Sequence, residues 1–323
     1  MSYKNQHPLL ELSEANLFLQ IERFVERVRK GSVRTMEFPE AFLNLLRRFN
    51  AVYDPTSNYT FSARIQLFVK LVNEVNSVGS STCLEFDLRD EAFVQMLMDR
   101  LQQGSKLVEY ADKQQQVECD RNAISLNMYL DCLMTHYSKL LFVRVDLKYK
   151  NECTHQINIT IFDAHMKCLL KYVGKRRRCF ESLEGYVWVL EQGDNESGYH
   201  CHLLLIYGAS DHQAGWHYAD QTGKLWVEIT EGKGLFFNCH DTTYIKKFID
   251  KDTYGLDIVY RSDVSKRKNV KEMAKYLVKD AQHLRVKVSG MKKTFGHGSF
   301  KSKTRRGTEQ TIYAQYQDLR DDF

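Results

Sequence analysis

The feature that most constrains the fold is a run of apolar residues that directly follows two histidines. Residues 200–206 read HCHLLLI, and a short apolar run of this length is typical of a buried β-strand. Side chains alternate between the two faces of a strand, so His200 and His202 are predicted to point to one side and Cys201 to the other. Two imidazoles placed in this way can take adjacent positions on one metal ion.

A carboxylate is predicted beside the two histidines. Residues 185–191 (GYVWVLE) also read as a strand, and the polar residues 193–198 suit a hairpin turn. The hairpin would bring Glu191 close to His200 and His202. One carboxylate and two imidazoles suit Mn²⁺ or Mg²⁺, and Zn²⁺ stays open. A His-x-His pair alone is weak evidence, because such histidines are more often ordinary hydrogen-bonded residues of a sheet.

Length and composition set broad limits. A chain of 323 residues suggests two domains. No apolar run approaches the roughly 20 residues of a membrane span, and the N-terminus lacks the pattern of a signal sequence. We therefore expect a cytoplasmic protein with no membrane partner. None of the eight cysteines forms a Cys-x-x-Cys pair, which argues against a zinc ribbon or a disulfide framework.

The charge is distributed unevenly. Residues 1–139 have a net charge of −2, whereas residues 261–308 hold 15 basic and three acidic side chains. Such a basic segment indicates binding to nucleic acid. The alternative is a solvated tail, which charge runs usually are.

The first part of the chain, residues 1–135, is predicted to be helical, because its apolar residues recur at spacings of three and four. The expected helices cover about 14–30, 42–49, 62–78 and 91–101. Residues 102–120 are polar and could form a surface helix or a linker. No catalytic group stands out, so a helical accessory or interaction domain is the preferred interpretation.

The second part mixes strands and helices. Strands are expected at 140–149, 185–191, 199–206, 225–230 and 255–260, and helices at 122–137, 160–175, 241–249 and 269–282, with a turn at 231–238. This order predicts an α+β fold, in which helices pack on one face of an antiparallel sheet. The predicted division is 1–135, 136–290 and a basic tail at 291–323.

The helix predicted at 269–282 carries a second motif. Tyr276 and Lys279 are three residues apart and would be neighbours at the edge of its apolar face. Tyrosine can attack a phosphodiester as a nucleophile, but its pKa of about 10 means that it needs help at neutral pH. A nearby metal ion and ammonium group can supply that help. The alternative is an ordinary boundary tyrosine beside a solvated lysine.

Four segments, FVRVDLKY, GYVWVLEQG, GYHCHLLLIYG and MAKYLVKD, occur in this order. Together they resemble the HUH endonucleases, which comprise rolling-circle replication initiators, relaxases and related transposases. The pattern is most similar to the inovirus gene-2-like replication proteins, also called the YagK/YfjJ C-terminal domain family. The resemblance covers about residues 140–300. Cys201 takes the middle position of the histidine motif, which is usually hydrophobic.

The resemblance implies an HUH-type antiparallel sheet at 136–290 and a replication initiator that nicks single-stranded DNA at an origin. It implies a metal ion at Glu191, His200 and His202 that polarises the scissile phosphate. Tyr276 would attack with support from Lys279, leaving a free 3′-hydroxyl and a 5′-phosphotyrosine link. The helix holds one tyrosine, which disfavours the two-tyrosine variants of the superfamily.

The resemblance also implies partners in the cytoplasm of a bacterial host. A host polymerase would extend the 3′ end, and a host helicase would unwind the DNA, because the sequence contains no Walker motif. Phe295 and Phe300 could stack on bases. The basic residues expected to contact DNA are Lys275, Lys287, Lys292, Lys293, Lys301, Lys303, Arg305 and Arg306.

Two other functions stay open. The chain could be a DNA-binding regulator or packaging factor of a mobile element that has lost catalysis, although a complete set of five active-site residues argues against this. It could also be a transposase or relaxase with the same chemistry. Relaxases usually add a third histidine near the pair, and His212 and His217 lie close downstream.

Overall fold

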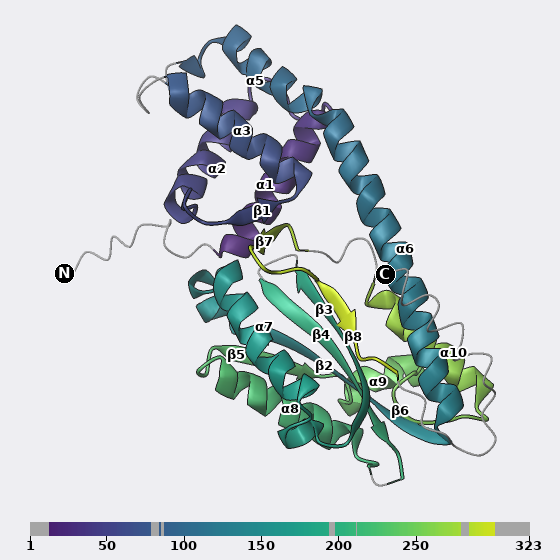
Figure 1. The fold of residues 1–323 in the computed structure, drawn as a ribbon. Coiled ribbons are helices and arrows are strands. Elements are labelled where there is room, and N and C mark those ends of the chain that lie inside the picture. Colours follow the sequence, from purple (N-terminus) through teal and green to yellow (C-terminus); the bar gives the residue numbers. More distant parts are fainter. Residues whose placement is uncertain are drawn as a thin grey trace.

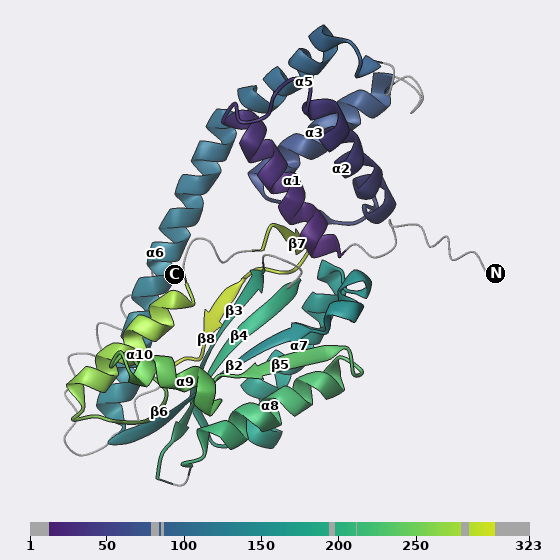
Figure 2. The ribbon, with the colours of Figure 1, turned by 180° about the vertical axis from the view of Figure 1, so that it is seen from behind.

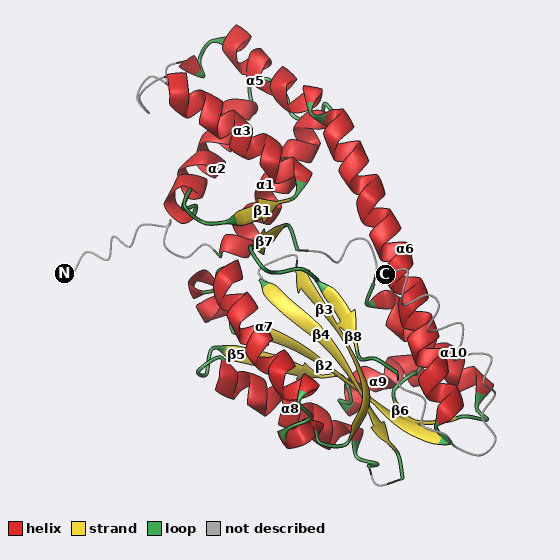
Figure 3. Ribbon diagram, in the orientation of Figure 1, coloured by secondary structure: helices red, strands yellow, loops and turns green. Residues whose placement is uncertain are grey.

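The computed structural model describes residues 13–78, 84, 87–193, 198–210, 212–278 and 284–300. A helical part comes first and an α+β part follows it (Figure 1, Figure 3). The helical part contains α1 (Glu14–Arg29), α2 (Phe38–Val52), α3 (Ala63–Val78), α5 (Glu91–Gln103) and the short strand β1 (Tyr59–Phe61). These positions confirm the helices predicted in the first 101 residues.

A single long helix, α6 (Ser105–His136), leads from the helical part to the α+β part. The sequence predicted a separate helix at 122–137 after a polar stretch that could be a surface helix or a linker. No glycine or proline interrupts residues 105–136, so the helix runs through the polar stretch. Its second half packs on the sheet through Leu126, Tyr129, Leu130 and Leu133, which are buried. The domain boundary at residue 135 stays a prediction.

The larger sheet is antiparallel throughout, as predicted. Its strands are β2 (Lys139–Tyr149), β3 (Leu183–Gln192), β4 (Tyr199–Gly208), β5 (Gly234–Asn238), β6 (Asp257–Tyr260) and β8 (Phe295–His297). The order is β5-β2-β4-β3-β8, and β6 also pairs with β2. The β3–β4 hairpin lies in the interior of the sheet with β4 next to β2, so the predicted site is built on two inner strands.

Helices cover both faces of this sheet, which corrects the prediction of a single covered face. α7 (Ile159–Gly174) and α8 (Gly215–Ile229) pack on one side, and α6 and α10 (Val264–Tyr276) pack on the other (Figure 1, Figure 2). The physical reason is that the central strands are apolar on both sides. In β4, for example, Leu203 and Leu205 join one core while Leu204 and Ile206 join the other.

The strand predicted at 225–230 is wrong, because these residues belong to α8 or directly follow it. The alternation in LWVEIT is part of a longer helical pattern, in which Ala219, Thr222, Gly223 and Trp226 are buried. The predicted turn at 231–238 instead contains β5. Gly223 allows the two elements to touch, since a Cβ there would lie 2.2 Å from the ring of Phe236.

α10 is also placed differently from the predicted helix at 269–282. It begins five residues earlier, where the side chain of Asp263 accepts a hydrogen bond from the backbone of Lys266 at 2.8 Å. It ends at Tyr276. By contrast, α9 (Thr242–Ile249) begins as predicted, capped by Asp241.

In the parts of the chain described above, every helix is too short or too polar to cross a lipid bilayer.

Buried polar contacts join the helical part to the β3–β4 hairpin. The carboxylate of Glu14 accepts hydrogen bonds from the backbone of Ile159 at 2.7 Å and from the hydroxyl of Tyr199 at 2.8 Å. Arg285 donates to Glu22 at 2.8 Å and to the carbonyl of Gln192 at 2.8 Å. Strand β1 pairs with β7 (Val286–Val288), which completes the connection.

Replacing Glu14 tests this connection. Glu14→Ala would leave the buried hydroxyl of Tyr199 and the backbone N–H of Ile159 without their acceptor, and should cost about 2 kcal/mol in the free energy of unfolding. Glu14→Gln keeps an oxygen in the same place and should cost less than half as much. Urea denaturation followed by circular dichroism measures both variants. Equal stability of Glu14→Ala and the unaltered protein would contradict this account.

Candidate active site

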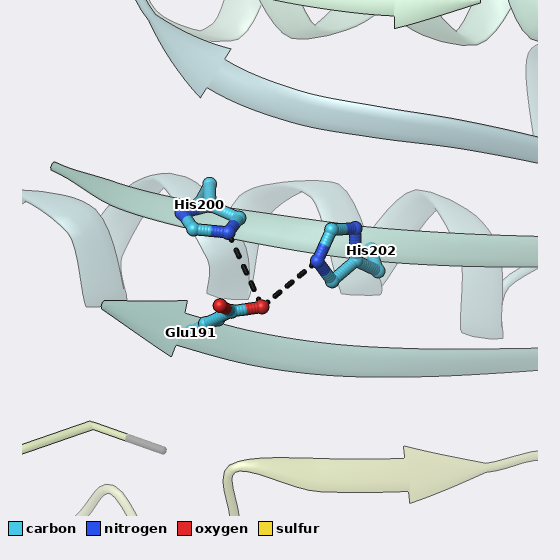
Figure 4. A group of neighbouring side chains, drawn as sticks. All are labelled: Glu191, His200 and His202. Carbon is cyan, nitrogen blue, oxygen red and sulfur yellow. Dashed lines mark hydrogen bonds and ion pairs between the residues drawn. The ribbon is translucent and has the colours of Figure 1, made fainter. Parts of the chain in front are cut away.

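Glu191, His200 and His202 converge where β3 ends and β4 begins, at the turn end of the β3–β4 hairpin (Figure 4). Glu191 and His200 are directly opposite each other across the two strands. The Oε2 atom of Glu191 lies 2.9 Å from His202 Nε2 and 3.3 Å from His200 Nε2. The three potential ligand atoms all lie within 4.8 Å of one another. The donor set therefore fits a divalent metal ion, and the hairpin brings these residues together as predicted.

Hydrogen bonds within the site shift the pKa values of Glu191 and His202 even without a metal ion. Burial raises the pKa of Glu191, but hydrogen bonds to His200 and His202 outweigh it and hold the pKa at about 2. Burial lowers the pKa of His202, but hydrogen bonds to Asp146 and Glu191 outweigh it and raise the pKa to about 9. A metal ion at His202 would therefore replace a proton on that ring.

Asp146 orients His202 from the neighbouring strand β2. The two residues are cross-strand partners, and Asp146 Oδ1 lies 2.7 Å from His202 Nδ1. A carboxylate so close requires that Nδ1 carry the proton, so Nε2 can offer a lone pair to a metal ion. An acceptor behind a ligating histidine fixes the ring and its tautomer in this way.

Arg144 completes the support for this histidine. Its guanidinium contacts both oxygens of Asp146, at 3.0 and 3.2 Å. Burial raises the pKa of Asp146, but the charge of Arg144 and the contact with His202 outweigh it and hold that pKa well below its usual range. The backbone N–H of Arg144 donates to His240 Nε2 at 3.3 Å, and His240 is held in turn by Asp257 at 2.9 Å.

Asp146 and Arg144 were not predicted as site residues. The signal for them is the alternation of apolar and polar residues in 143–148, which puts both on the polar side of the strand predicted at 140–149. That pattern could not show which strand would lie beside them. Only the register of β2 and β4 identifies His202 as the neighbour of Asp146.

Tyr276 is the last residue of α10, and its side chain is 51% exposed. The helix packs on the sheet face that carries the metal-ligand candidates, since Val270 and Ala274 share a core with Leu204 and Ile206. Tyr276 also lines a cavity with Arg144. Lys279 lies outside the described residues, so its predicted proximity to Tyr276 stays a prediction.

The basic residues predicted to contact DNA are only partly described. Lys275 is exposed and pairs with Glu272 at 3.0 Å. Lys287 lines a cavity beside α6, and Lys292 and Lys293 line the adjoining one. The other four predicted DNA contacts, Lys301, Lys303, Arg305 and Arg306, lie outside the described residues.

Two other sequence predictions can be compared with the structure. Phe300 is buried and its ring contacts His136 with centroids 5.4 Å apart, so the prediction that it stacks on bases is wrong. Phe295 is half-buried and lines both cavities beside α6. His212 contacts Tyr218, and among the described residues no third histidine joins the metal-ligand group.

A sequence model of the YagK/YfjJ C-terminal domain matches residues 101–298, which include every residue of the site described above. The chain belongs to the YagK/YfjJ C-terminal domain family. Comparisons with curated proteins and with solved structures returned no match. The match begins within α5 and includes all of α6, so the matched region covers the long helix as well as the α+β part.

Metal binding is the first test of the site. Adding Mn²⁺ should raise the melting temperature, because a ligand that binds only the folded state stabilises it. His200→Ala should abolish the rise. Asp146→Asn should weaken Mn²⁺ binding by roughly 10- to 100-fold, since Asp146 is not itself a candidate ligand but orients His202. Lys148→Ala, on the same strand, is the matched control, and an equal loss there would contradict the assignment.

The affinity for Mn²⁺ should also depend on pH. The pKa of about 9 for His202 means that this ring carries a proton below pH 9, and the proton must leave when the metal binds. The apparent affinity should therefore rise by close to tenfold per pH unit between pH 6 and 8. Calorimetry in buffers of different ionisation enthalpy would measure the released proton. An affinity that is flat over this range would contradict the expected exchange.

Proposed function

We propose that this protein is a metal-dependent HUH endonuclease that nicks single-stranded DNA at an origin and so initiates rolling-circle replication of a phage, satellite or plasmid. The observation that carries the proposal is the meeting of two motifs on one face of the sheet. Glu191, His200 and His202 gather at the end of the β3–β4 hairpin, and Tyr276 ends a helix packed on the same face.

Each residue has a chemical task. The Tyr276 oxygen attacks the phosphorus of the scissile phosphodiester, and the bond from phosphorus to the 3′ oxygen breaks. Tyr276 gives up its phenolic proton, and the leaving 3′ oxygen takes up a proton to become a free 3′-hydroxyl. The 5′-phosphate stays joined to the tyrosine. Glu191, His200 and His202 would hold Mn²⁺ or Mg²⁺, which when bound polarises the phosphate and offsets its negative charge.

Three further side chains support the attack of Tyr276 on the phosphate. Asp146 and Arg144 hold His202 in the tautomer that a metal ligand needs. Lys279 would stabilise charge that develops on the phosphate or the phenolate. Religation is the reverse attack by a 3′-hydroxyl on the phosphotyrosine, and it needs no ATP because the link retains the bond energy.

The proposed partners follow from the products. The free 3′-hydroxyl is a primer for a host polymerase, and a host helicase would separate the strands ahead of it. The basic residues from Lys275 to Arg306 would contact the phosphate backbone, with a binding strength that falls steeply as salt rises. We place this activity in the cytoplasm of a bacterial host. The relaxase alternative is weakened because His212 contacts Tyr218 instead of the metal-ligand group.

Covalent capture tests the proposal directly. The protein is mixed with Mn²⁺ and labelled single-stranded DNA from its own genetic element, and the mixture is resolved under denaturing conditions. A denaturant-resistant protein–DNA band should form, and Tyr276→Phe and His200→Ala should each abolish it. Tyr260→Phe, which alters another half-exposed tyrosine outside α10, is the control.

The possible outcomes separate the hypotheses. If the band survives Tyr276→Phe, the protein still forms a covalent link to DNA, but a residue other than Tyr276 is the nucleophile. Salt-sensitive binding to the origin region without any band would favour a regulator that has lost catalysis. Joining of two DNA ends, without a single origin nick, would favour a transposase.

A further inference from the structure

We infer that the cavity between α9 and the last turn of α10 binds one nucleobase of the DNA strand, next to the phosphate that is cut. The inference rests on the proposed function and names a binding site within it. The cavity has a volume of about 600 Å³ and is bounded by α9, residues 253–256 and α10. That volume is within the usual range for small-molecule sites, which is about 300–1,000 Å³.

One wall of the cavity is aromatic. Tyr244 and Phe248 lie four residues apart on α9, and their ring centroids are 5.2 Å apart. Both rings are only half-buried, and α9 contributes no buried residue to the core. Tyr254 approaches from the loop after α9, and its hydroxyl donates to Asp257 at 2.5 Å. An amphipathic helix that leaves its aromatic face in a cavity offers flat surfaces for stacking.

The rim of the cavity is basic. The ammonium group of Lys247 lies 4.1 Å from the ring centre of Tyr244 and 5.1 Å from that of Phe248. Lys251 adds a second positive charge at the rim, and Arg144, which is buried and paired with Asp146, also lines the cavity. Glu272 is the one carboxylate among the lining residues, and it is paired with Lys275 outside the cavity at 3.0 Å.

This combination fits a nucleotide better than other ligands. A nucleobase has a flat π surface that stacks on aromatic side chains, and its phosphate is attracted by lysine and arginine. An acidic ligand without a ring would leave the aromatic wall unused. An apolar ligand would leave the positive charges of Lys247 and Lys251 at the rim unused.

The position of the cavity gives it a role in the reaction. Tyr276 lines it on one side and Arg144 lines it on another. Arg144 also contacts Asp146, which in turn contacts His202. A base held here would therefore fix the adjoining phosphate between the tyrosine and the metal-ligand group, and would give the enzyme a preference at one nucleotide position.

The test measures binding without cleavage. The full chain is titrated, in EDTA, into a set of 12-nucleotide single-stranded DNAs that carry 2-aminopurine at successive positions. Quenching at one position should mark the stacked base. Phe248→Ala should abolish that quenching and weaken binding by roughly tenfold. Ile249→Ala, which removes a neighbouring and more exposed side chain that does not line this cavity, should change binding by less than about twofold.

A second variant protects the test against a folding defect. Phe248→Leu retains most of the apolar volume but removes the flat ring, so it should lose the quenching while the melting temperature is unchanged. Equal losses in Phe248→Leu and Ile249→Ala, or quenching that survives both Phe248 variants, would overturn the inference. So would tight binding of an aromatic peptide at this cavity in place of DNA.

The binding test and the covalent capture test different hypotheses, so either hypothesis can be rejected without the other. Because the binding test contains no metal and requires no cleavage, the cavity could bind a base even if no covalent band ever forms. Conversely, a covalent band that forms equally well with Phe248→Leu, at unchanged DNA affinity, would reject the cavity and leave the nickase standing.

Discussion

The hydrogen-bonded register of β2, β4 and β3 is the constraint on which the candidate site depends. It sets Glu191 opposite His200 and Asp146 opposite His202. A shift of one residue would turn both histidines to the other face of the sheet, because side chains alternate along a strand. The register is held by the apolar residues that follow the histidines. Leu203 and Leu205 enter one core, and Leu204 and Ile206 enter the other.

The same register brings together four charged side chains, each of which would be unfavourable if it were buried without a partner of opposite charge. Glu191, Asp146, Arg144 and His202 are all largely screened from water, and burial opposes the charged form of each. They are tolerated because carboxylates alternate with cationic groups along a chain of contacts. Removing one member would leave its neighbour buried and unpaired, which is costly. A divalent metal ion would bind where His202 loses its proton. The side chains that would hold the ion are therefore already in position before the metal replaces that proton.

The helical part of the chain is tied to this arrangement. Its contacts reach residues beside the metal-ligand candidates: Glu14 binds Tyr199, and Glu22 binds Arg285, which binds the carbonyl of Gln192. Tyr199 and Gln192 directly adjoin His200 and Glu191 in the two strands. The N-terminal helical part therefore supports the turn end of the hairpin, whereas the sequence suggested only an accessory domain.

The sequence by itself determined the potential ligands of the candidate metal site and most of the elements. Local patterns suffice for these, since the HCHLLLI run indicates its own strand and Ser13 and Asp241 cap their own helices. The tertiary structure decided everything that depends on which segments become neighbours. It placed helices on both faces of the sheet, made residues 225–229 helical against β5, and set Asp146 behind His202. It also formed the aromatic cavity beside Tyr276 from four separate segments. No local pattern contains these pairings, because they arise from packing between residues far apart in the chain.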